Sequence, residues 1–214
     1  RQIALPYDLT VPFARLVAAN WQNLPIPFKR YQIQRVWRAE KPQKGRLREF
    51  YQCDIDVIGT RSLICEAEVA KVISVVFAEL GFNDAVIKVN SRRLLNSILE
   101  SFEVTEPLPV IRIIDKLSKI GQEAVTEMLQ EIKVKAASKL IDLLKPGKNN
   151  RETFKKLKDF DTDEIEEFFS NCRALKVQQQ CLQFDPSLAR GLDYYTGISY
   201  EVYSPKNDLG ALCA

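Results

Sequence analysis

Histidine is absent from this chain of 214 residues. The imidazole side chain is the one that enzymes use most often as a general base, and Ser–His and Cys–His nucleophile pairs require it. Its absence excludes these arrangements. Any catalysis must therefore depend on arginine, carboxylates, a bound metal ion or groups of the substrate itself.

Paired cysteines and long apolar runs are also absent. The five cysteines are widely spaced, without a Cys-x-x-Cys motif or a histidine that could complete a zinc site: Cys53, Cys65, Cys172, Cys181 and Cys213. No apolar run approaches the ~20 residues of a membrane-spanning helix, and residues 1–6 lack the layout of a signal peptide. We therefore predict a cytoplasmic protein with reduced thiols and no membrane association.

A strong net charge is missing as well. The chain carries 31 lysines and arginines against 28 aspartates and glutamates, a formal net charge of +3. Such a balance identifies no partner. A nucleic-acid role would depend on local clusters, such as the basic residues between 41 and 48.

Two strand-like runs, residues 30–40 and 49–59, flank a basic loop that contains Gly45. This order predicts an antiparallel hairpin with a long loop. With a period of two, the second run has two faces, formed by Tyr51, Cys53, Ile55 and Val57 and by Phe50, Gln52, Asp54 and Asp56. We expect the first face to be core, and the second to form the polar floor of a ligand pocket with Arg38 and Glu40.

Apolar residues at helical spacing predict a helix over 62–80, which Gly81 ends. A short strand is expected at 86–89. Ser91 is then a suitable N-cap for a helix over 92–101.

Between residues 107 and 183 strand signals give way to lysine, glutamate and leucine. We expect helices over 123–132, 136–144 and 163–181, with a loop at 146–150. This part of the chain is therefore predicted to be a helical block inserted between sheet segments.

One further run, residues 187–201, places Arg190, Asp193, Tyr194 and Tyr195 beside two glycines. Glycine lets the backbone approach a ligand closely, so this composition favours a site for a small polar molecule. The alternative is a hairpin strand with a tyrosine-rich face toward solvent.

Asp8 and Thr10 lie two positions apart in a segment, residues 2–12, that we expect to be extended. In that conformation the carboxylate and the hydroxyl share a face and can both accept hydrogen bonds from an ammonium group. The alternative is that one of them caps a helix with Pro12 as its first residue.

Three separated segments, residues 5–15, 35–56 and 188–201, have the order and spacing of the catalytic domain of histidyl-tRNA synthetases. The chain therefore resembles that family of class II aminoacyl-tRNA synthetases. The resemblance implies an α+β fold, in which a class II synthetase-type antiparallel sheet is flanked by helices and interrupted by a helical insertion domain.

The resemblance also implies three regions. The first part of the catalytic domain, with the motif 2 hairpin, would span 1–106, the insertion domain 107–183, and the continuation of the catalytic domain 184–214. In the family a motif 1 helix at the dimer interface comes earlier, and motif 3 and an anticodon-binding domain come later. We expect this chain to be a fragment of a homodimeric protein.

For ATP, the resemblance assigns Arg38 to the α-phosphate and the substrate carboxylate, a task suited to a rigid charged fork. Glu40 would accept from the adenine amino group, and adenine would stack on Phe50. Arg46 and Arg48 would meet the outer phosphates and the acceptor end of the tRNA. The alternative for this loop is a solvated basic turn.

For L-histidine, the resemblance places Asp8, Thr10 and Gln52 around the α-ammonium group. Asp56, where many members of the family carry glutamate, and Tyr195 would bind the imidazole. A polar pocket of this kind can reject analogues that lack the hydrogen-bonding groups by roughly 10⁴ to 10⁵, so no editing domain is required.

Arg190 matches the arginine that the family places beside the reacting carboxylate and α-phosphate, so Arg38 and Arg190 are the predicted catalytic residues. Tyr194 would line the histidine pocket or support it from behind. The substrate carboxylate is itself the nucleophile, so alignment and charge stabilisation can suffice without a histidine base. The products would be histidyl-adenylate and then charged histidine tRNA, with Mg²⁺ bridging ATP oxygens and no protein ligand assigned to it.

Three other interpretations keep a similar fold. One is a catalytically inactive paralogue, such as the regulatory subunit of ATP phosphoribosyltransferase in histidine biosynthesis. The others are a tRNA-sensing domain of a stress kinase and a class II synthetase for proline or threonine. Inactive paralogues tend to lose the residues that match Arg38, Arg190 and Asp193, and all three occur here. Their presence favours the active enzyme.

Overall fold

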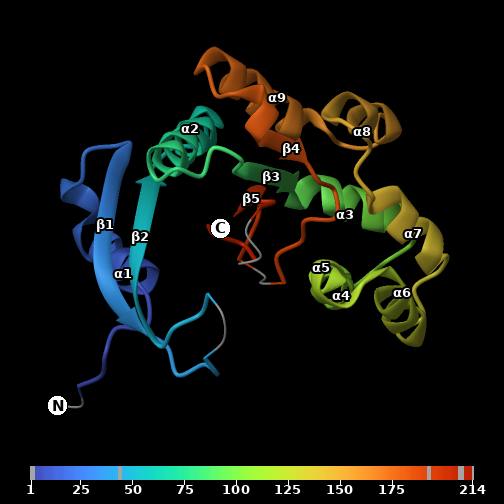
Figure 1. The fold of residues 1–214 in the computed structure, drawn as a ribbon, viewed down its shortest axis with the longest axis horizontal. Helices are drawn as coiled ribbons and strands as arrows, with labels where there is room; N and C mark the ends of the chain where they lie inside the picture. The colour runs from blue at the N-terminus through green and yellow to red at the C-terminus, as the bar shows by residue number, and fades with distance from the viewer. Residues whose placement is uncertain (1–2, 43–44, 192–193, 207–209, 214) are drawn as a thin grey trace. The chain divides into compact units, whose positions relative to one another are not determined.

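The computed structural model describes residues 3–42, 45–191, 194–206 and 210–213. The chain forms two compact units, Arg1–Cys65 and Glu66–Ala214. Figure 1 shows their helices and strands. In the described part of the chain, no helix is long and apolar enough to cross a membrane.

The first unit is built on an antiparallel hairpin. Its strands, β1 (Phe28–Trp37) and β2 (Glu49–Ile58), pair in register from Phe28 opposite Ile58 to Trp37 opposite Glu49. Before them lie α1 (Thr10–Asn20) and a 3₁₀ turn, η1 (Trp21–Asn23). The predicted hairpin is confirmed.

The two faces of this hairpin are covered in the opposite sense from the prediction. On β2, Phe50, Gln52, Asp54 and Asp56 are half-buried, whereas Tyr51 is 64% exposed and Ile55 39% exposed. The reason is α1, which lies against the polar face: the Phe13 ring centroid is 3.9 Å from Cζ of Arg30 and 6.3 Å from the ring centroid of Phe28. The period of two was right, but the choice of the covered face was wrong.

The second unit contains a three-stranded sheet with β3 (Val86–Ser91) in the centre (Figure 1). β4 (Leu182–Phe184) pairs parallel to one edge of β3, and β5 (Ile198–Tyr203) pairs antiparallel to the other. The sheet segments and helices confirm the α+β class. β4 was not predicted, because three residues are too few to show a period.

Helices precede and follow β3. α2 (Ile64–Glu79) ends near Gly81, whose φ of 86° is the left-handed conformation that glycine adopts readily. α3 (Arg92–Ser101) begins at the cap residue Ser91, whose side chain accepts from the N–H groups of Arg93 and Leu94. Both helices and the cap agree with the sequence analysis.

The region between residues 107 and 183 is mostly helical, as predicted. It contains α4 (Pro107–Ile114), α5 (Leu117–Ile120), α6 (Gln122–Glu131), α7 (Ala137–Leu144), α8 (Asn150–Lys156), α9 (Asp163–Ala174) and η2 (Gln179–Cys181). α9 ends before the predicted Cys181, because Lys176 adopts φ 55° and the N–H of Val177 turns back to the carbonyl of Cys172. The division of the chain at residues 106 and 183 stays a prediction.

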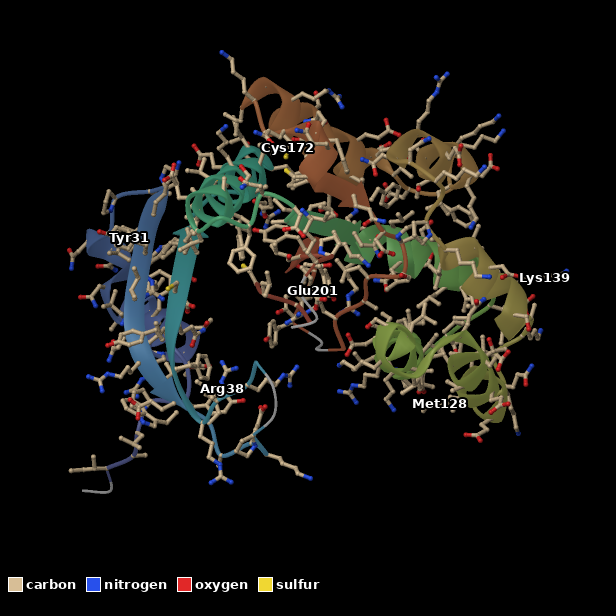
Figure 2. The ribbon with its side chains drawn as sticks, viewed as in Figure 1. Tyr31, Arg38, Met128, Lys139, Cys172 and Glu201 are labelled. Atoms are coloured by element: carbon tan, nitrogen blue, oxygen red, sulfur yellow. The ribbon has the colours of Figure 1, made fainter. Side chains whose placement is uncertain are left out.

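One hydrophobic cluster joins this sheet to the helices. Its largest fully buried side chains include Phe168 from α9, Phe184 from β4 and Ile87 from β3. Cys172, labelled in Figure 2, is also fully buried in it. Burial raises the pKa of the Cys172 thiol to about 12. This core fixes the position of β5, which contains the last residues of the run at 187–201.

Candidate functional site

In the first unit, Arg38 and Phe50 come together at the end of the hairpin where the loop joins β1 to β2. Cζ of Arg38 lies 5.1 Å from the ring centroid of Phe50 and 4.9 Å from that of Tyr7. The Arg38 Nε donates to the carbonyl of Tyr7 over 3.4 Å, and its backbone N–H donates to the carbonyl of Arg48 over 2.9 Å. The guanidinium is thus held beside an aromatic face (Figure 2 labels Arg38).

The predicted loop residues Glu40, Arg46 and Arg48 are exposed and lie near one another. Nη1 of Arg46 is 3.8 Å from a carboxylate oxygen of Glu40, and Nε of Arg48 donates to the Glu40 carbonyl over 3.3 Å. Exposed ion pairs of this kind contribute little stability, because water competes for both groups. An anionic ligand could therefore displace them at small cost.

Asp8 and Thr10 do not share an extended segment, so that expectation was wrong. Thr10 begins α1 and is exposed. Asp8 is half-buried, and its Oδ1 accepts from the backbone N–H of Val11 over 3.3 Å in the first turn of the helix. The chain forms a helix here instead of an extended segment. Asp8 accepts from a backbone N–H group that has no partner within the helix, which agrees with the capping alternative for Asp8.

Asp56 lies opposite Arg30 in the hairpin, and the two form an ion pair of 2.7 Å. Their side chains are 21% and 13% exposed. Burial raises the pKa of the Asp56 carboxyl, and Arg30 opposes that rise. Nη2 of Arg30 also donates to the carbonyl of Leu9 over 3.3 Å. Arg30 therefore ties the hairpin to the start of α1.

Gln52 and Asp54 lie next to this pair on the same half-buried face. Burial and the charge of Asp56 raise the pKa of Asp54, while a side-chain hydrogen bond with Gln52 lowers it. The other polar atom of that amide, Gln52 Oε1, is buried without a hydrogen-bond partner among the described residues. Asp8, Asp54 and Asp56 thus place three carboxylates around the guanidinium of Arg30, an arrangement suited to a cationic group.

The sequence analysis missed Arg30 and did not assign a role to Asp54. Both were within reach of the period-two pattern. Asp54 was placed on the polar face, and Arg30 is directly across from Asp56 once the register is known. The register itself depends on the loop between the strands, which the sequence pattern leaves open.

In the second unit, Arg190 is fixed by β5 and by Tyr195. Its Nη1 donates to Oε1 of Glu201 over 2.5 Å, and its Nη2 contacts the hydroxyl of Tyr195 over 3.2 Å. Burial lowers the pKa of Arg190, but Tyr195 and Glu201 outweigh it and raise the pKa above its ordinary value. The guanidinium therefore stays charged in a site where its side chain is only 25% exposed.

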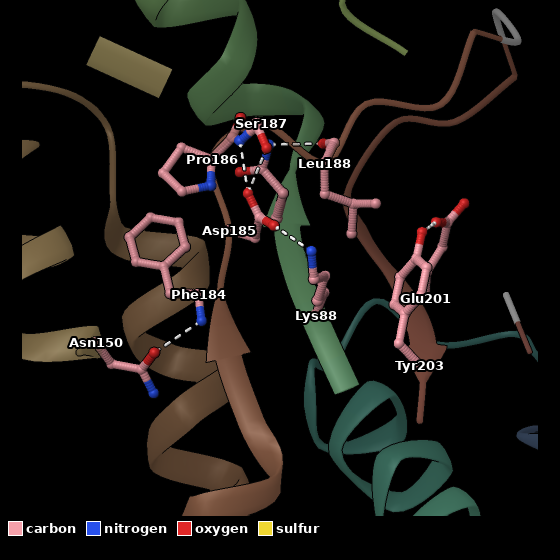
Figure 3. Close-up of polar contacts among 10 residues, drawn as sticks. Lys88, Asn150, Phe184, Asp185, Pro186, Ser187, Leu188, Glu201 and Tyr203 are labelled. Carbon is pink, nitrogen blue, oxygen red and sulfur yellow. Dashed lines mark hydrogen bonds and ion pairs between the residues drawn. The ribbon is translucent and has the colours of Figure 1, made fainter. Parts of the chain in front are cut away.

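The sequence analysis did not assign a role to Glu201 or Tyr203. Glu201 accepts from Arg190 and also contacts Tyr203. Tyr203 donates its hydroxyl to Glu201, as the dashed line in Figure 3 marks. Burial and this hydrogen bond raise the pKa of Tyr203. In the same view Lys88 pairs with Asp185 over 3.0 Å, and its Nζ lies 5.0 Å from the ring centroid of Tyr203.

Of the remaining predicted residues, Tyr194 is 68% exposed, and its ring centroid is 4.8 Å from that of Tyr195. Asp193 lies outside the described residues. A Cβ at Gly191 would lie 3.4 Å from Arg112, and one at Gly197 3.2 Å from Glu164. The space beside these two glycines is thus taken by the chain itself.

Metal-binding clusters are not found in the described ranges: no group of three or more cysteine, aspartate or glutamate side chains is placed to hold an ion. Mg²⁺ commonly retains several waters and binds through one or two carboxylates plus substrate phosphates.

Residues 1–211 match the family model described as histidyl-tRNA synthetase. Histidine–tRNA ligases from Clostridium tetani and Cytophaga hutchinsonii are 39% and 43% identical, over 99% and 98% of this chain. These matches cover 52% and 49% of the two relatives, so the chain spans about half of their length.

One solved structure agrees with this assignment, and a second shares the fold. A histidyl-tRNA synthetase from a Nostoc species superposes with a TM-score of 0.85 at 32% identity, over 99% of this chain and 53% of that one. A Bacillus halodurans protein described as an ATP phosphoribosyltransferase regulatory subunit/histidyl-tRNA synthetase has a TM-score of 0.74, over 94% of this chain and 54% of that one. It is only 20% identical, which shows a shared fold alone. The chain belongs to the histidyl-tRNA synthetase family.

Proposed function

We propose that the protein containing this chain is a histidine–tRNA ligase, which activates L-histidine with ATP and transfers it to histidine tRNA. The observation that carries the proposal is the half-buried polar face of the hairpin. It combines surplus carboxylates, a buried acceptor on Gln52 and an arginine beside an aromatic ring within a family of this activity.

ATP is proposed to bind at the loop end of the hairpin. Arg38 would hold the α-phosphate and the histidine carboxylate, while adenine would stack on Phe50, which lies 5.1 Å from that guanidinium. Glu40 would accept from the adenine amino group. The exposed Arg46 and Arg48 would bind the outer phosphates and the acceptor end of the tRNA.

L-Histidine is proposed to bind along the half-buried face. Gln52, Asp8 and Thr10 would surround its α-ammonium group. Thr10 would accept from that group through its hydroxyl at the start of α1. Asp56, steadied by Arg30 at 2.7 Å, would accept from the imidazole N–H. Tyr194 and Tyr195 of the second unit are also proposed as histidine-binding residues.

Arg190 is proposed as the second catalytic residue. Glu201 and Tyr195 hold two of its nitrogens, which pre-orients the guanidinium toward negative charge that builds up during attack of the carboxylate on the α-phosphorus. Fixed donors of this kind stabilise such charge without reorganisation. Mg²⁺ would enter with the phosphates of ATP and offset charge on the departing pyrophosphate.

The decisive experiment is histidine-dependent exchange of pyrophosphate into ATP by the full-length protein, followed by transfer of labelled histidine to histidine tRNA. We expect exchange with histidine only, and much less of it with Arg38→Ala. No exchange with any amino acid would refute the proposal and favour a binding module. Sedimentation and cell fractionation would test the proposed homodimer and its cytoplasmic location.

A further inference from the structure

We propose that Tyr203 is a positioning residue for Arg190, which it orients through the carboxylate of Glu201. This inference rests on the proposed function, because it concerns how the proposed catalytic arginine is held. Tyr203 acts on the reaction through these two side chains and is not required to contact the substrate.

The backbone of Arg190 is anchored, so the direction of its guanidinium depends on side-chain contacts. Nη2 of Arg92 donates to the carbonyl of Arg190 over 2.5 Å. At the guanidinium, Nη1 donates to Oε1 of Glu201 over 2.5 Å, and Nη2 contacts the hydroxyl of Tyr195 over 3.2 Å. The side chains of Arg190 and Glu201 are only 25% and 13% exposed, so water competes weakly for this ion pair. Glu201 therefore supplies the charged contact that directs the guanidinium.

Tyr203 holds the second oxygen of the same carboxylate. Glu201 and Tyr203 are two residues apart on β5, so their side chains lie on one face of the strand. The Tyr203 hydroxyl donates to Oε2 of Glu201 (Figure 3). A hydrogen bond to an ionised group is roughly twice as strong as one between neutral groups. Because both oxygens are held, the carboxylate cannot rotate freely, and Oε1 stays directed at Arg190.

Lys88 is a competing cation for this carboxylate. It lies directly across from Glu201 in the register of β3 and β5, where opposite charges attract. Its Nζ pairs instead with Asp185 over 3.0 Å and lies 5.0 Å from the ring centroid of Tyr203 (Figure 3). The Tyr203 hydroxyl thus occupies an oxygen that Lys88 could otherwise bind. Burial raises the pKa of Tyr203, so the hydroxyl keeps the proton that it donates.

The test is pyrophosphate exchange by the full-length protein with Tyr203→Phe, which keeps the ring beside Lys88 and removes the hydroxyl. We expect kcat to fall about 10-fold, because a misplacement of about 1 Å can cost up to about 10²-fold in rate. The KM values for histidine and ATP should stay within about twofold of the parent, since the guanidinium is still present.

A double-mutant cycle with Arg190→Ala separates positioning from a structural role. If Tyr203 acts through Arg190, adding Tyr203→Phe to Arg190→Ala should change kcat by less than about twofold. A structural role would lower kcat by the same factor in both backgrounds. The matched control is Tyr200→Phe, which removes a hydroxyl from the opposite face of β5, where Tyr200 packs against the hydrophobic cluster. It should keep kcat within about twofold of the parent.

A second measurement does not depend on activity. Phenylglyoxal modifies arginine side chains, and peptide mass spectrometry gives the rate at Arg190. We expect Arg190 to react at least about twofold faster in Tyr203→Phe and at the parental rate in Tyr200→Phe, because local opening exposes the guanidinium. Thermal unfolding shows whether each variant is folded. If Tyr203→Phe does not fold, the same measurement on Glu201→Gln tests the next contact, and an unchanged rate at Arg190 would overturn the inference.

Three other results would overturn it: a parental kcat in Tyr203→Phe, an equal fall in kcat with and without Arg190, or a raised histidine KM at an unchanged kcat. Each of these leaves the proposed function intact, because the parent still exchanges pyrophosphate. A parent without exchange, in which Tyr203→Phe still speeds the modification of Arg190, would refute the enzyme proposal and support the contact from Tyr203 through Glu201.

Discussion

Replacement of Arg190 by alanine separates catalysis from stability in this protein. The substitution removes the two nitrogens that contact Glu201 at 2.5 Å and Tyr195 at 3.2 Å. It also removes the charge proposed to act on the reacting phosphate. Both effects follow from the loss of the same guanidinium.

Loss of one preorganised donor at developing negative charge costs about 10²–10³ in rate. We expect a reduction of that order in kcat for histidine-dependent pyrophosphate exchange. For stability, Glu201 loses its cation while its side chain is only 13% exposed. Breaking a fully buried pair costs about 3–5 kcal/mol. Here about 2 kcal/mol is expected, because Arg190 is partly exposed and Tyr203 still donates to Glu201.

The assay is pyrophosphate exchange at saturating histidine, together with urea unfolding of the same full-length samples. The control is Arg190→Met combined with Glu201→Gln, which removes both charges. This double variant should regain most of the lost stability, since no unpaired carboxylate remains. Its exchange rate should stay low, because the guanidinium is still missing.

Two outcomes would refute this reasoning. If Arg190→Ala exchanges pyrophosphate at the parental rate, the guanidinium does not act in the reaction. If the double variant regains activity together with stability, the loss in Arg190→Ala came from the unpaired Glu201. A raised histidine Kd with an unchanged kcat would instead place Arg190 in substrate binding.

Three further predictions concern other parts of the chain. Asp56→Asn should raise the KM for histidine at least about 10-fold with little change in the KM for ATP, and an unchanged histidine KM would remove Asp56 from the imidazole pocket. Ser91→Ala should lower the free energy of unfolding by about 1 kcal/mol, measured by urea titration, because its hydroxyl accepts from the N–H groups of Arg93 and Leu94; no change would contradict the cap. Burial raises the pKa of Asp54 in the folded state, so the folded state binds that proton more tightly and the carboxylate destabilises it as pH rises from about 3.9 through the raised pKa. Asp54→Asn should therefore stabilise the protein at pH 7 and have little effect at pH 3, whereas equal effects at both pH values would contradict the shift.

Much of the fold could be predicted from the sequence because it depends on interactions between residues that are close in the chain. Apolar spacing predicted α2 and α3. Ser91 marked the start of α3 because its side-chain oxygen accepts from N–H groups of the first turn, and Gly81 marked the end of α2 because glycine adopts a positive φ readily. The hairpin of β1 and β2 followed from two alternating runs around a loop. The three segments that resemble the family could also be recognised from the sequence, because a motif is defined by the order and spacing of residues along the chain.

The site depended more on long-range contacts. A period of two identifies two faces of β2 but not the one that α1 covers, so the polar face with Asp54 and Asp56 was mistaken for the open one. Thr10 was placed in an extended segment because the pattern could not weigh helix formation against it.

The amino-acid sequence by itself determined which chemistry is available: no histidine, a set of arginines and acids, and a family order that matches residues 1–211. Only the tertiary structure decided which of these groups hold one another. Arg30 faces Asp56 through strand register, and Arg190 meets Glu201 through the return of the chain in β5. The physical reason is that ion pairs and buried acceptors depend on distance and solvent exclusion, which are set when separate elements pack, and not on spacing along the chain.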